Sequence, residues 1–412
     1  MPFRTWWKRF LCEADCGDPL NMESDNDVPI RALSLHDFGD HCNAWKGDSV
    51  NNLRDYSVTG IEAQNALQKG LAQAQWYSCP IGRRELKALM RRRNGPGIRD
   101  TLIWLGAMAL SGVLAFHFWG HWTSLPWFAL YGVLYGGASD SRWHECVHGT
   151  AFRTDWMNEV LYLVACVMML REPTVWRWSH SRHHTDTLIV GRDPEISNPR
   201  PTNFFKLFLD FFAVRTTAAT LYKLVVHSCG RLTAVDRCLI PAGEHPRVVW
   251  EARLGFLLLA SVFGACVAVG SILPALFVGL PSMYGSAFGV FVATTQHAGL
   301  AEDVLDHRLN SRTVYMNVVF RFLYWNMNYH LEHHLFPMVP FHALPRLHAV
   351  VKPYLPAPYA GCLAAYREII PTLMRQQKDT MYFIRRPLPQ SRSVESDQRP
   401  AAALDHPVAL EA

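Results

Sequence analysis

The sequence predicts an all-α integral membrane protein with two transmembrane helical hairpins, which give four spans, and a cytoplasmic helical cap that carries clustered histidines. Two observations lead to this fold class. The chain contains two long segments without a charged residue, and histidine clusters follow the end of each segment. The chain has 412 residues, half of them hydrophobic, and a formal net charge of +5. The position of the charges is therefore more informative than their sum.

The two uncharged segments are residues 101–139 and 254–301, which contain no Asp, Glu, Lys or Arg. As single helices they would extend roughly 58 and 72 Å, about twice the ~30 Å hydrocarbon core of a bilayer. Each is therefore expected to fold as a hairpin, with the break near Pro126 in the first and near Pro274 and Pro281 in the second. A buried hairpin of a large soluble protein is the less favoured alternative, because uncharged segments of this length are rare outside lipid.

The placement of basic residues predicts the orientation of the hairpins. Residues 82–99, directly before the first hairpin, contain seven Lys or Arg, whereas the presumed turns at 120–126 and 270–276 contain none. The positive-inside rule therefore places both turns outside, and both termini and residues 140–253 in the cytoplasm. The expected location is a bacterial inner membrane. Anionic lipid headgroups are sufficient to explain the basic segment, so nucleic-acid binding is not indicated.

The composition divides the chain into four regions. Residues 1–60 are polar and rich in Asp and Asn, and are expected to form a poorly ordered extension; a start codon assigned too early would give the same text. Residues 61–100 are an amphipathic and basic segment that leads to the membrane domain at 101–385. Residues 386–412, rich in Pro, Ser and charge, are expected to be disordered. Within the membrane domain, the apolar stretch 160–170 is too short to span and is expected to be buried or to lie in the interface plane.

Many of the 19 histidines are clustered. The clusters are HECVH, HSRHH, HLEHH and the single histidine of TTQHAG, which contain His144, His148, His180, His183, His184, His330, His333, His334 and His297. Spacings of i, i+3 and i+4 put the members of a cluster on one face of a helix. Three such bases on one face pack poorly, and a bound metal is the usual explanation. Isolated histidines are interpreted as ordinary core or surface residues: His117, His121, His227, His307, His342 and His348.

The clusters are expected to meet on one side of the membrane. His144 follows the inner end of the first hairpin, His297 follows that of the second, and one triplet lies after each hairpin. Eight or nine neutral imidazoles are too many for one metal ion and about right for two. Imidazole suits iron, copper, zinc and nickel alike. Zinc is the least favoured, since structural zinc sites close at four ligands and often include cysteine.

The motifs HECVHGTAF, HSRHH, QHAG and NYHLEHHLFP resemble the histidine boxes of the membrane fatty acid desaturase superfamily, which includes acyl and alkane hydroxylases and carotenoid ketolases. The resemblance covers roughly residues 95–350, in the order and with the hairpin spacing of the family. The stretches WRWSHSRHHTDTLIVGRDPEI and RDTLIWLG are most similar to the bacterial branch that includes the rhizopine-catabolism oxygenase. The resemblance implies a di-iron centre on the cytoplasmic side that activates O2 and removes hydrogen from an unactivated C–H bond.

The resemblance also implies roles for individual residues. The eight histidines of the three boxes would be iron ligands, and His297 matches an additional histidine of the family. Some relatives have Asn four positions before that histidine, where this chain has Ala293, and Asn326 or Asn328 would then supply the missing contact. Carboxylates in or beside the boxes are expected to accept hydrogen bonds from ligating imidazoles, with a solvated surface charge as the alternative. They are Asp140, Glu145, Asp186 and Glu332.

Three functions are consistent with these patterns. The first is desaturation of a fatty acyl lipid, and the second is hydroxylation by a monooxygenase of the same fold, acting on an alkane, an acyl chain or a small ring compound. The third is a histidine-rich membrane metal transporter or receptor, which predicts ligands within the spans at bilayer mid-depth. The sequence has no haem motif, ferredoxin-type cysteine set or dinucleotide-binding loop. A separate ferredoxin, rubredoxin or cytochrome is therefore expected to supply electrons at the basic cytoplasmic face.

Overall fold

Helices make up nearly all the regular structure in residues 54–72 and 74–389, the part of the chain that the computed structural model describes. Extended pairing in this part is limited to two isolated bridges, Thr313 with Tyr329 and Val314 with Tyr359. The all-α class predicted from the sequence is therefore confirmed for these residues. Most of the predicted extension at 1–60 and of the predicted tail at 386–412 lies outside the described residues.

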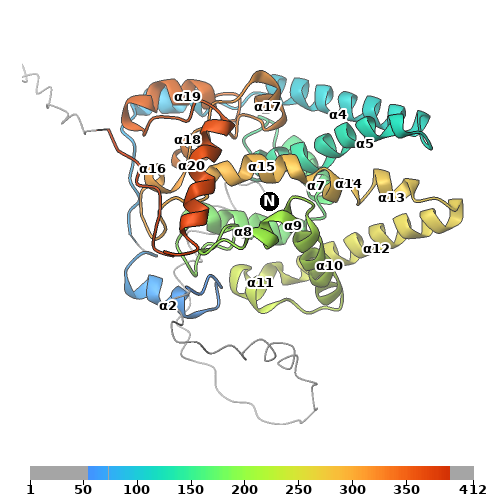
Figure 1. Ribbon diagram of the computed structural model, residues 1–412, viewed down its shortest axis with the longest axis horizontal. Helices are drawn as coiled ribbons and strands as arrows, with labels where there is room; N and C mark the ends of the chain where they lie inside the picture. The colour runs from blue at the N-terminus through green and yellow to red at the C-terminus, as the bar shows by residue number, and fades with distance from the viewer. Residues whose placement is uncertain (1–53, 73, 390–412) are drawn as a thin grey trace, which may run out of the picture.

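The helices follow one another as Figure 1 labels them. The first half comprises α2 Ile61–Gln68, α3 Arg83–Leu89, α4 Asn94–His117, α5 Leu125–Gly132, α6 Ala138–Val147, α7 Asp155–Met168, α8 Pro173–Thr185, α9 Phe204–Asp210, α10 Val214–Ser228 and α11 Ala234–Leu239. The second half comprises α12 His245–Val269, α13 Leu273–Phe277, α14 Pro281–Tyr284, α15 Ser286–His297, α16 His307–Asn310, α17 Val318–Leu323, α18 His330–Leu335, α19 Leu344–Val351 and α20 Cys362–Arg375. Short 3-10 turns are η3 Trp122–Ser124, η5 Ala242–Glu244 and η6 Lys352–Tyr354, and a π-helical segment, η4, covers Val133–Gly137.

The first hairpin consists of α4 and a return limb formed by α5, η4 and α6. Pro126 lies in the first turn of α5, where its missing N–H is not needed and its fixed φ suits the helix. Trp104 of α4 is fully buried, and its Nε1 donates a hydrogen bond of 2.8 Å to the carbonyl oxygen of Leu134 in the π-helical segment. The opposite face of α4 is apolar and open, with Val113 64% exposed. This outward apolar face is expected of a helix surrounded by lipid.

The second hairpin has a long outgoing helix and a broken return limb. Helix α12 ends at Val269, and the positive φ of 58° at the following Gly270 allows the chain to turn away. The return limb is divided into α13, α14 and α15, and Pro274 and Pro281 each lie in the first turn of a new helix. Within the described residues, two helices are long and apolar enough to cross a membrane, 83–117 and 242–269.

The turns of both hairpins lie at the same end of the molecule, on the right of Figure 1, and the helices α8 and α18 lie toward the other end. Between the hairpins, α7 buries Tyr162 and Ala165 and exposes Val160 and Val164 on its other face. Helix α9 has no buried residue, and its Phe205 is widely exposed. With 14 and 7 residues, α7 and α9 are both too short to span a bilayer, and α7 is amphipathic.

The described end of the predicted N-terminal extension is attached to the body. Arg54 forms ion pairs with Glu302 and Asp303, and the Tyr56 hydroxyl donates a hydrogen bond of 3.0 Å to Glu302. Helix α2 then packs close to the loop after α8, where an added Cβ at Gly191 would lie 2.3 Å from the backbone nitrogen of Ala63. The N-terminal segment therefore covers the loop that follows the first histidine triplet.

A buried charge cluster joins α8, α10 and α11. The His227 ring is fully buried, with Nδ1 2.7 Å from Glu172 and Nε2 3.2 Å from Asp236. Burial lowers the pKa of His227, but the hydrogen bonds to Asp236 and Glu172 outweigh it and raise the pKa to about 9. The charged ring therefore links three helices, which agrees with the structural role predicted for this histidine.

This charge cluster predicts a pH dependence of stability. A group whose pKa is higher in the folded state than in the unfolded chain stabilises the fold below the unfolded value of 6.5, and this contribution is lost as the pH rises toward about 9. The free energy of unfolding, measured in detergent micelles, should fall across this window for the wild type. The fall should be absent in His227→Gln and retained in His121→Gln, a variant in the exposed turn. An unchanged slope in His227→Gln would contradict the charged state.

Candidate metal centre

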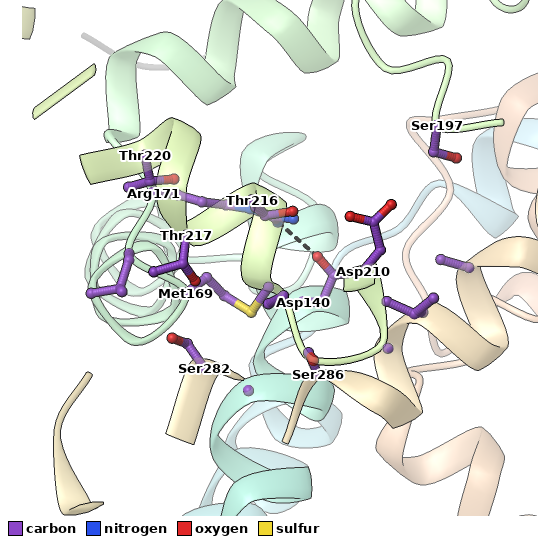
Figure 2. A pocket seen from close by; sticks show the side chains of 16 residues that line it. Asp140, Met169, Arg171, Ser197, Asp210, Thr216, Thr217, Thr220, Ser282 and Ser286 are labelled. Atoms are coloured by element: carbon purple, nitrogen blue, oxygen red, sulfur yellow. Dashed lines mark hydrogen bonds and ion pairs between the residues drawn. The ribbon is translucent and has the colours of Figure 1, made fainter. Parts of the chain in front are cut away.

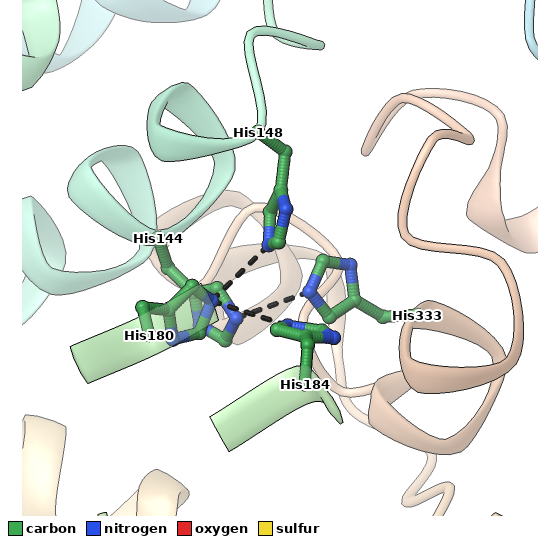
Figure 3. Close-up of side chains that lie close together, drawn as sticks. All are labelled: His144, His148, His180, His184 and His333. Carbon is green, nitrogen blue, oxygen red and sulfur yellow. Dashed lines mark hydrogen bonds between the residues drawn. The ribbon is translucent and has the colours of Figure 1, made fainter. Parts of the chain in front are cut away.

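The nine histidines predicted as ligands come together in two adjoining groups. Within each group, one ring nitrogen of every residue lies within 4.8 Å of one nitrogen of each other member. The first group, shown in Figure 3, contains His144, His148, His180, His184 and His333, and the second contains His183, His297, His330 and His334. No other group of three or more candidate ligands is found in the described part of the chain.

The two triplets contribute to both groups in a reciprocal way. On α8, His180 and His184 are one helical turn apart and enter the first group, while His183 enters the second. On α18, His330 and His334 enter the second group, while His333 enters the first. Residues at i and i+4 lie on nearly the same line of a helix and i+3 lies beside them. The spacing His-x-x-His-His therefore lets one helix supply ligands to two neighbouring points.

The remaining ligands come from the ends of the hairpins. His144 lies in the last turn of α6 and His148 is the C-cap residue of that helix, so both belong to the return limb of the first hairpin. His297 is the last residue of α15, in the return limb of the second hairpin. The first group thus takes two ligands from one hairpin and the second group takes one ligand from the other.

The ring nitrogens are spaced as ligands of a common ion would be. In the first group, His180 Nε2 lies 3.1 Å from His148 Nε2 and 3.2 Å from His184 Nε2. In the second, His330 Nε2 lies 2.9 Å from His297 Nε2 and 3.0 Å from His334 Nε2. Two imidazole nitrogens about 2.1 Å from one ion and at right angles to each other would be about 3 Å apart.

The outer nitrogens of four rings have partners that fix the tautomer. His180 Nδ1 lies 3.2 Å from a carboxylate oxygen of Glu195, and His183 Nδ1 lies 2.9 Å from Asp193. His297 Nδ1 donates to the carbonyl oxygen of Asn310 at 2.7 Å. Carboxylate and carbonyl oxygens only accept hydrogen bonds at these positions, so Nδ1 carries the proton in the neutral ring and Nε2 carries the lone pair.

The fourth ring is that of His334, and its tautomer is fixed by a hydroxyl group. Thr187 Oγ1 donates its hydrogen to the carbonyl oxygen of His183 at 2.6 Å, so it accepts from His334 Nδ1 at 3.2 Å. The lone pairs of His297 and His334 therefore both point toward His330 Nε2, which can donate at most one hydrogen. Lone pairs that face one another in a buried site need a cation between them. The donor set fits metal ions, and it does not fit a network of hydrogen bonds alone.

The pKa of His183 is shifted in the opposite direction from the pKa values of His180, His184 and His330. Burial, reinforced by neighbouring imidazoles, lowers the pKa of His180, His184 and His330 well below the usual value, so these rings are neutral bases. Burial acts in the same direction on His183, but the charge and hydrogen bond of Asp193 outweigh it and raise the pKa to about 9. Asp193 therefore favours a positive charge at His183 Nε2, whether a proton or a metal ion supplies it.

The four carboxylates predicted to support the ligands have other partners in the structure, so this prediction needs correction. Asp140 pairs with Arg171, and Asp186 pairs with Arg182 and Arg192. The Glu145 carboxylate accepts from the Thr150 hydroxyl and the Phe341 amide, and Glu332 accepts from Thr313 and His348. For Glu145 and Glu332 the physical reason is helix geometry, because adjacent residues point about 100° apart and a carboxylate next to a ligand faces away from it. Asp140 and Asp186 are instead held by their arginine partners.

The two asparagines proposed to replace a missing ligand contact also face elsewhere. Asn326 accepts from Arg321 at 2.9 Å and donates to the Phe341 carbonyl at 3.1 Å, and Asn328 donates to the Val314 carbonyl at 2.9 Å. His297 itself lies in the second group, so the Ala293 position leaves no gap that these amides would need to fill.

Sequence reasoning missed the carboxylates that do contact ligands, Asp193 and Glu195. They lie in the loop after α8, where positive φ angles at Leu188 and Gly191 turn the chain back over the helix. Asp193 also accepts from the Leu188 amide at 2.8 Å, which holds the loop in this shape. The available signal was the short run RDPE, which places two acids nine and eleven residues after His184, just beyond Gly191.

The described chain is thus an all-helical protein with two long apolar helices and a buried site of nine imidazoles suited to two metal ions. Residues 120–365 match the family model of the fatty acid desaturases, a match over more than half of the chain. The chain belongs to the fatty acid desaturase family, an oxidoreductase family associated with membranes and hydrophobic substrates. No curated protein matches the chain.

The contact between Asp193 and His183 predicts a specific loss of metal affinity. Asp193→Asn keeps the size of the side chain but removes the charge that orients and polarises the ring, and such outer contacts are typically worth about 10–100-fold in affinity. Iron per chain, measured by mass spectrometry after a chelator titration, should fall accordingly. Asp186→Asn, seven residues earlier, is the matched control, because the Asp186 carboxylate pairs with Arg182 and Arg192. Equal iron retention in the two variants would argue against the proposed contact.

Proposed function

We propose that this chain is a membrane-embedded enzyme that uses O2 to oxidise unactivated C–H bonds at two iron ions, with desaturation of fatty acyl lipids as its reaction. The observation that carries the proposal is the reciprocal pair of histidine groups, with lone pairs directed at two neighbouring points. Membership in the fatty acid desaturase family selects iron among the metals that imidazole binds. The ligands would be the nine histidines of the two groups.

Bound iron would supply the activation of O2, and the chain supplies the position and protonation of its ligands. Asp193, Glu195, Thr187 and the Asn310 carbonyl hold protons on the outer nitrogens, so the inner nitrogens stay free to bind. Burial keeps water from the ligand nitrogens, which limits side reactions during C–H cleavage. These contacts set ligand geometry without taking part in the removal of hydrogen.

The proposed topology has four spans, with the site and both termini on the cytoplasmic side of a bacterial inner membrane. It is supported by the common end at which both hairpin turns lie, and by the basic residues of 82–99 at the start of α4. The ligands lie on α8 and α18 and at the ends of the return limbs, in the last turn and C-cap of α6 and at the last residue of α15. Ligands at the ends of the proposed spans disfavour the metal transporter or receptor, which would hold its ligands at mid-depth within the spans.

An apolar groove supports an acyl lipid as the substrate. A cavity of about 290 Å³ lies between α7, α10 and α12 and is lined largely by leucine and valine, including Leu163, Val167, Leu254 and Leu258. Leu254 and Val167 are exposed on the outer, apolar surface, so the groove opens where acyl chains would surround the protein. Its inner end is lined by Arg171, whose guanidinium stacks on Trp143 next to the histidines.

A second cavity favours a second candidate, hydroxylation of a compound with polar groups. This cavity of about 240 Å³ is shown in Figure 2, where Thr216, Thr217 and Ser282 surround it together with the Asp140–Arg171 ion pair. It lies close to the site, because Asp140 precedes His144 by four residues and Ala293 precedes His297 by four, about 6 Å along a helix. Hydroxyl-rich walls suit a small ring compound better than a plain acyl chain, and the narrower resemblance to the rhizopine-catabolism branch belongs with this candidate.

Product analysis tests the proposed oxidation directly. His183→Ala removes a ligand of the second group, and we expect loss of the product by more than about tenfold and loss of bound iron. Lipid and small-molecule profiles of cells that express each form are compared by mass spectrometry, with His121→Ala in the exposed turn as the control. A product that differs from its precursor by two hydrogens indicates desaturation, and a gain of one oxygen indicates hydroxylation. An unchanged profile with full iron content would refute the proposal.

The two cavities predict opposite effects for two filling variants. If the substrate is an acyl lipid, Leu258→Trp should block the apolar groove and reduce product formation by about tenfold or more, while Thr217→Trp should have a small effect. If the substrate is a polar compound, the order should be reversed. The rate of product formation per bound iron is the measurement, so that differences in metal content do not enter. Full activity in both variants would exclude both cavities as substrate sites.

A further inference from the structure

A stack of aromatic rings leads from the surface into both histidine groups. The indole of Trp76 lies flat on the imidazole of His307, with centroids 4.2 Å apart and planes at 8°. The His307 ring lies 5.1 Å from that of His334, at an interplanar angle of 34°. His334 in turn stacks on His184, at 4.4 Å and 26°. His334 belongs to the second group and His184 to the first, so one column of rings reaches both.

The outer end of this column is held firmly and is partly exposed. Trp76 lies between α2 and α3, and its Nε1 donates a hydrogen bond of 3.1 Å to the carbonyl oxygen of Thr185, directly after the ligand His184. The next residue, Tyr77, donates its amide to the Leu305 carbonyl at 2.8 Å. The Nε1 bond and the neighbouring backbone bond therefore hold Trp76 in place, while the residue remains partly exposed.

The middle ring is buried and is not itself a candidate ligand. His307 is only 5% exposed and belongs to neither histidine group. Its imidazole places a flat conjugated ring between the indole of Trp76 and the ligand His334.

The reaction proposed above requires electrons from outside the chain. Reduction of O2 to two waters takes four electrons and four protons, of which the two broken C–H bonds supply two of each. The other two electrons must come from outside, and the sequence contains no cofactor motif of its own for them. Electrons tunnel between protein groups at rates that fall steeply with the gap between conjugated rings. A column of rings in van der Waals contact is therefore a favourable route.

We propose that Trp76 and His307 form the entry route for electrons, from a carrier protein docked over Trp76 to the metal site through His334 and His184. This inference rests on the proposed function. The carrier is a small acidic iron–sulfur protein that is oxidised by one electron in each encounter, and each electron reduces one bound ferric ion to ferrous. Two encounters complete one cycle. The charge beside the route fits an acidic partner, since Arg182 and Arg192 share the single carboxylate of Asp186.

The test is the rate at which the iron-loaded protein is reduced, measured without O2 or substrate. Reduced ferredoxin is mixed with the protein in a stopped-flow instrument, and Mössbauer spectra count the ferrous iron formed. Trp76→Leu and His307→Leu should each slow reduction by ferredoxin more than about tenfold, while Trp76→Phe, which keeps a ring, should stay within about threefold of the wild type. Trp122→Leu, in the exposed turn of the first hairpin, is the control and should match the wild type.

Dithionite, a small reductant that can reach the site by other paths, separates an electron route from a packing role. The proposal requires that Trp76→Leu keeps its iron content and is reduced by dithionite at the wild-type rate. Reduction by ferredoxin at the wild-type rate in Trp76→Leu would overturn the proposal, and so would equal slowing by both reductants or loss of iron in both Trp76 variants. A wild-type protein that accepts electrons through Trp76 but yields no oxidised product would refute the proposed function and leave the route standing.

Discussion

The structure depends on one physical constraint, which is that nine imidazole lone pairs are directed at two points in a site shielded from water. In the absence of cations, lone pairs that face one another repel. The outer nitrogens of four rings hold their protons in contacts with Asp193, Glu195, Thr187 and the Asn310 carbonyl, so these protons do not relieve the repulsion. Bound cations would relieve this repulsion and would link four helices from different parts of the chain, in addition to the apolar packing around them.

The period of the α-helix explains why the triplet occurs twice. Two residues at i and i+4 face one point and the residue at i+3 faces a point beside it, so a single turn can serve two ions. Because α8 gives two ligands to the first group and α18 gives two to the second, the two helices are arranged as counterparts. A change at either helix alters both groups, and the ions would not behave as independent sites.

Periodicity and hairpin length, both local properties of the sequence, were sufficient to predict the helical class and to select the nine histidines that converge. Contacts made by a loop that folds back on the chain were not predictable in this way. Asp193 reaches His183 because a loop folds back through Gly191, whereas Glu145 is adjacent to His144 and still faces away from the site. The sequence indicates no special role for His307, because nothing near it in the sequence shows that the Trp76 indole stacks on its ring. Helical spacing of the histidines predicted the candidate ligands. Adjacency in the sequence did not predict which carboxylates contact them.

The reciprocal use of the triplets also has a consequence for biosynthesis. The first group contains both His144 and His333, and the second contains both His183 and His334, so neither is complete until nearly the whole membrane domain has left the ribosome. An ion captured earlier would find only part of its ligand set. If the chain binds two ions as proposed, loading would belong to the last stage of maturation, after both hairpins have formed. The ions would then link the two halves of the chain.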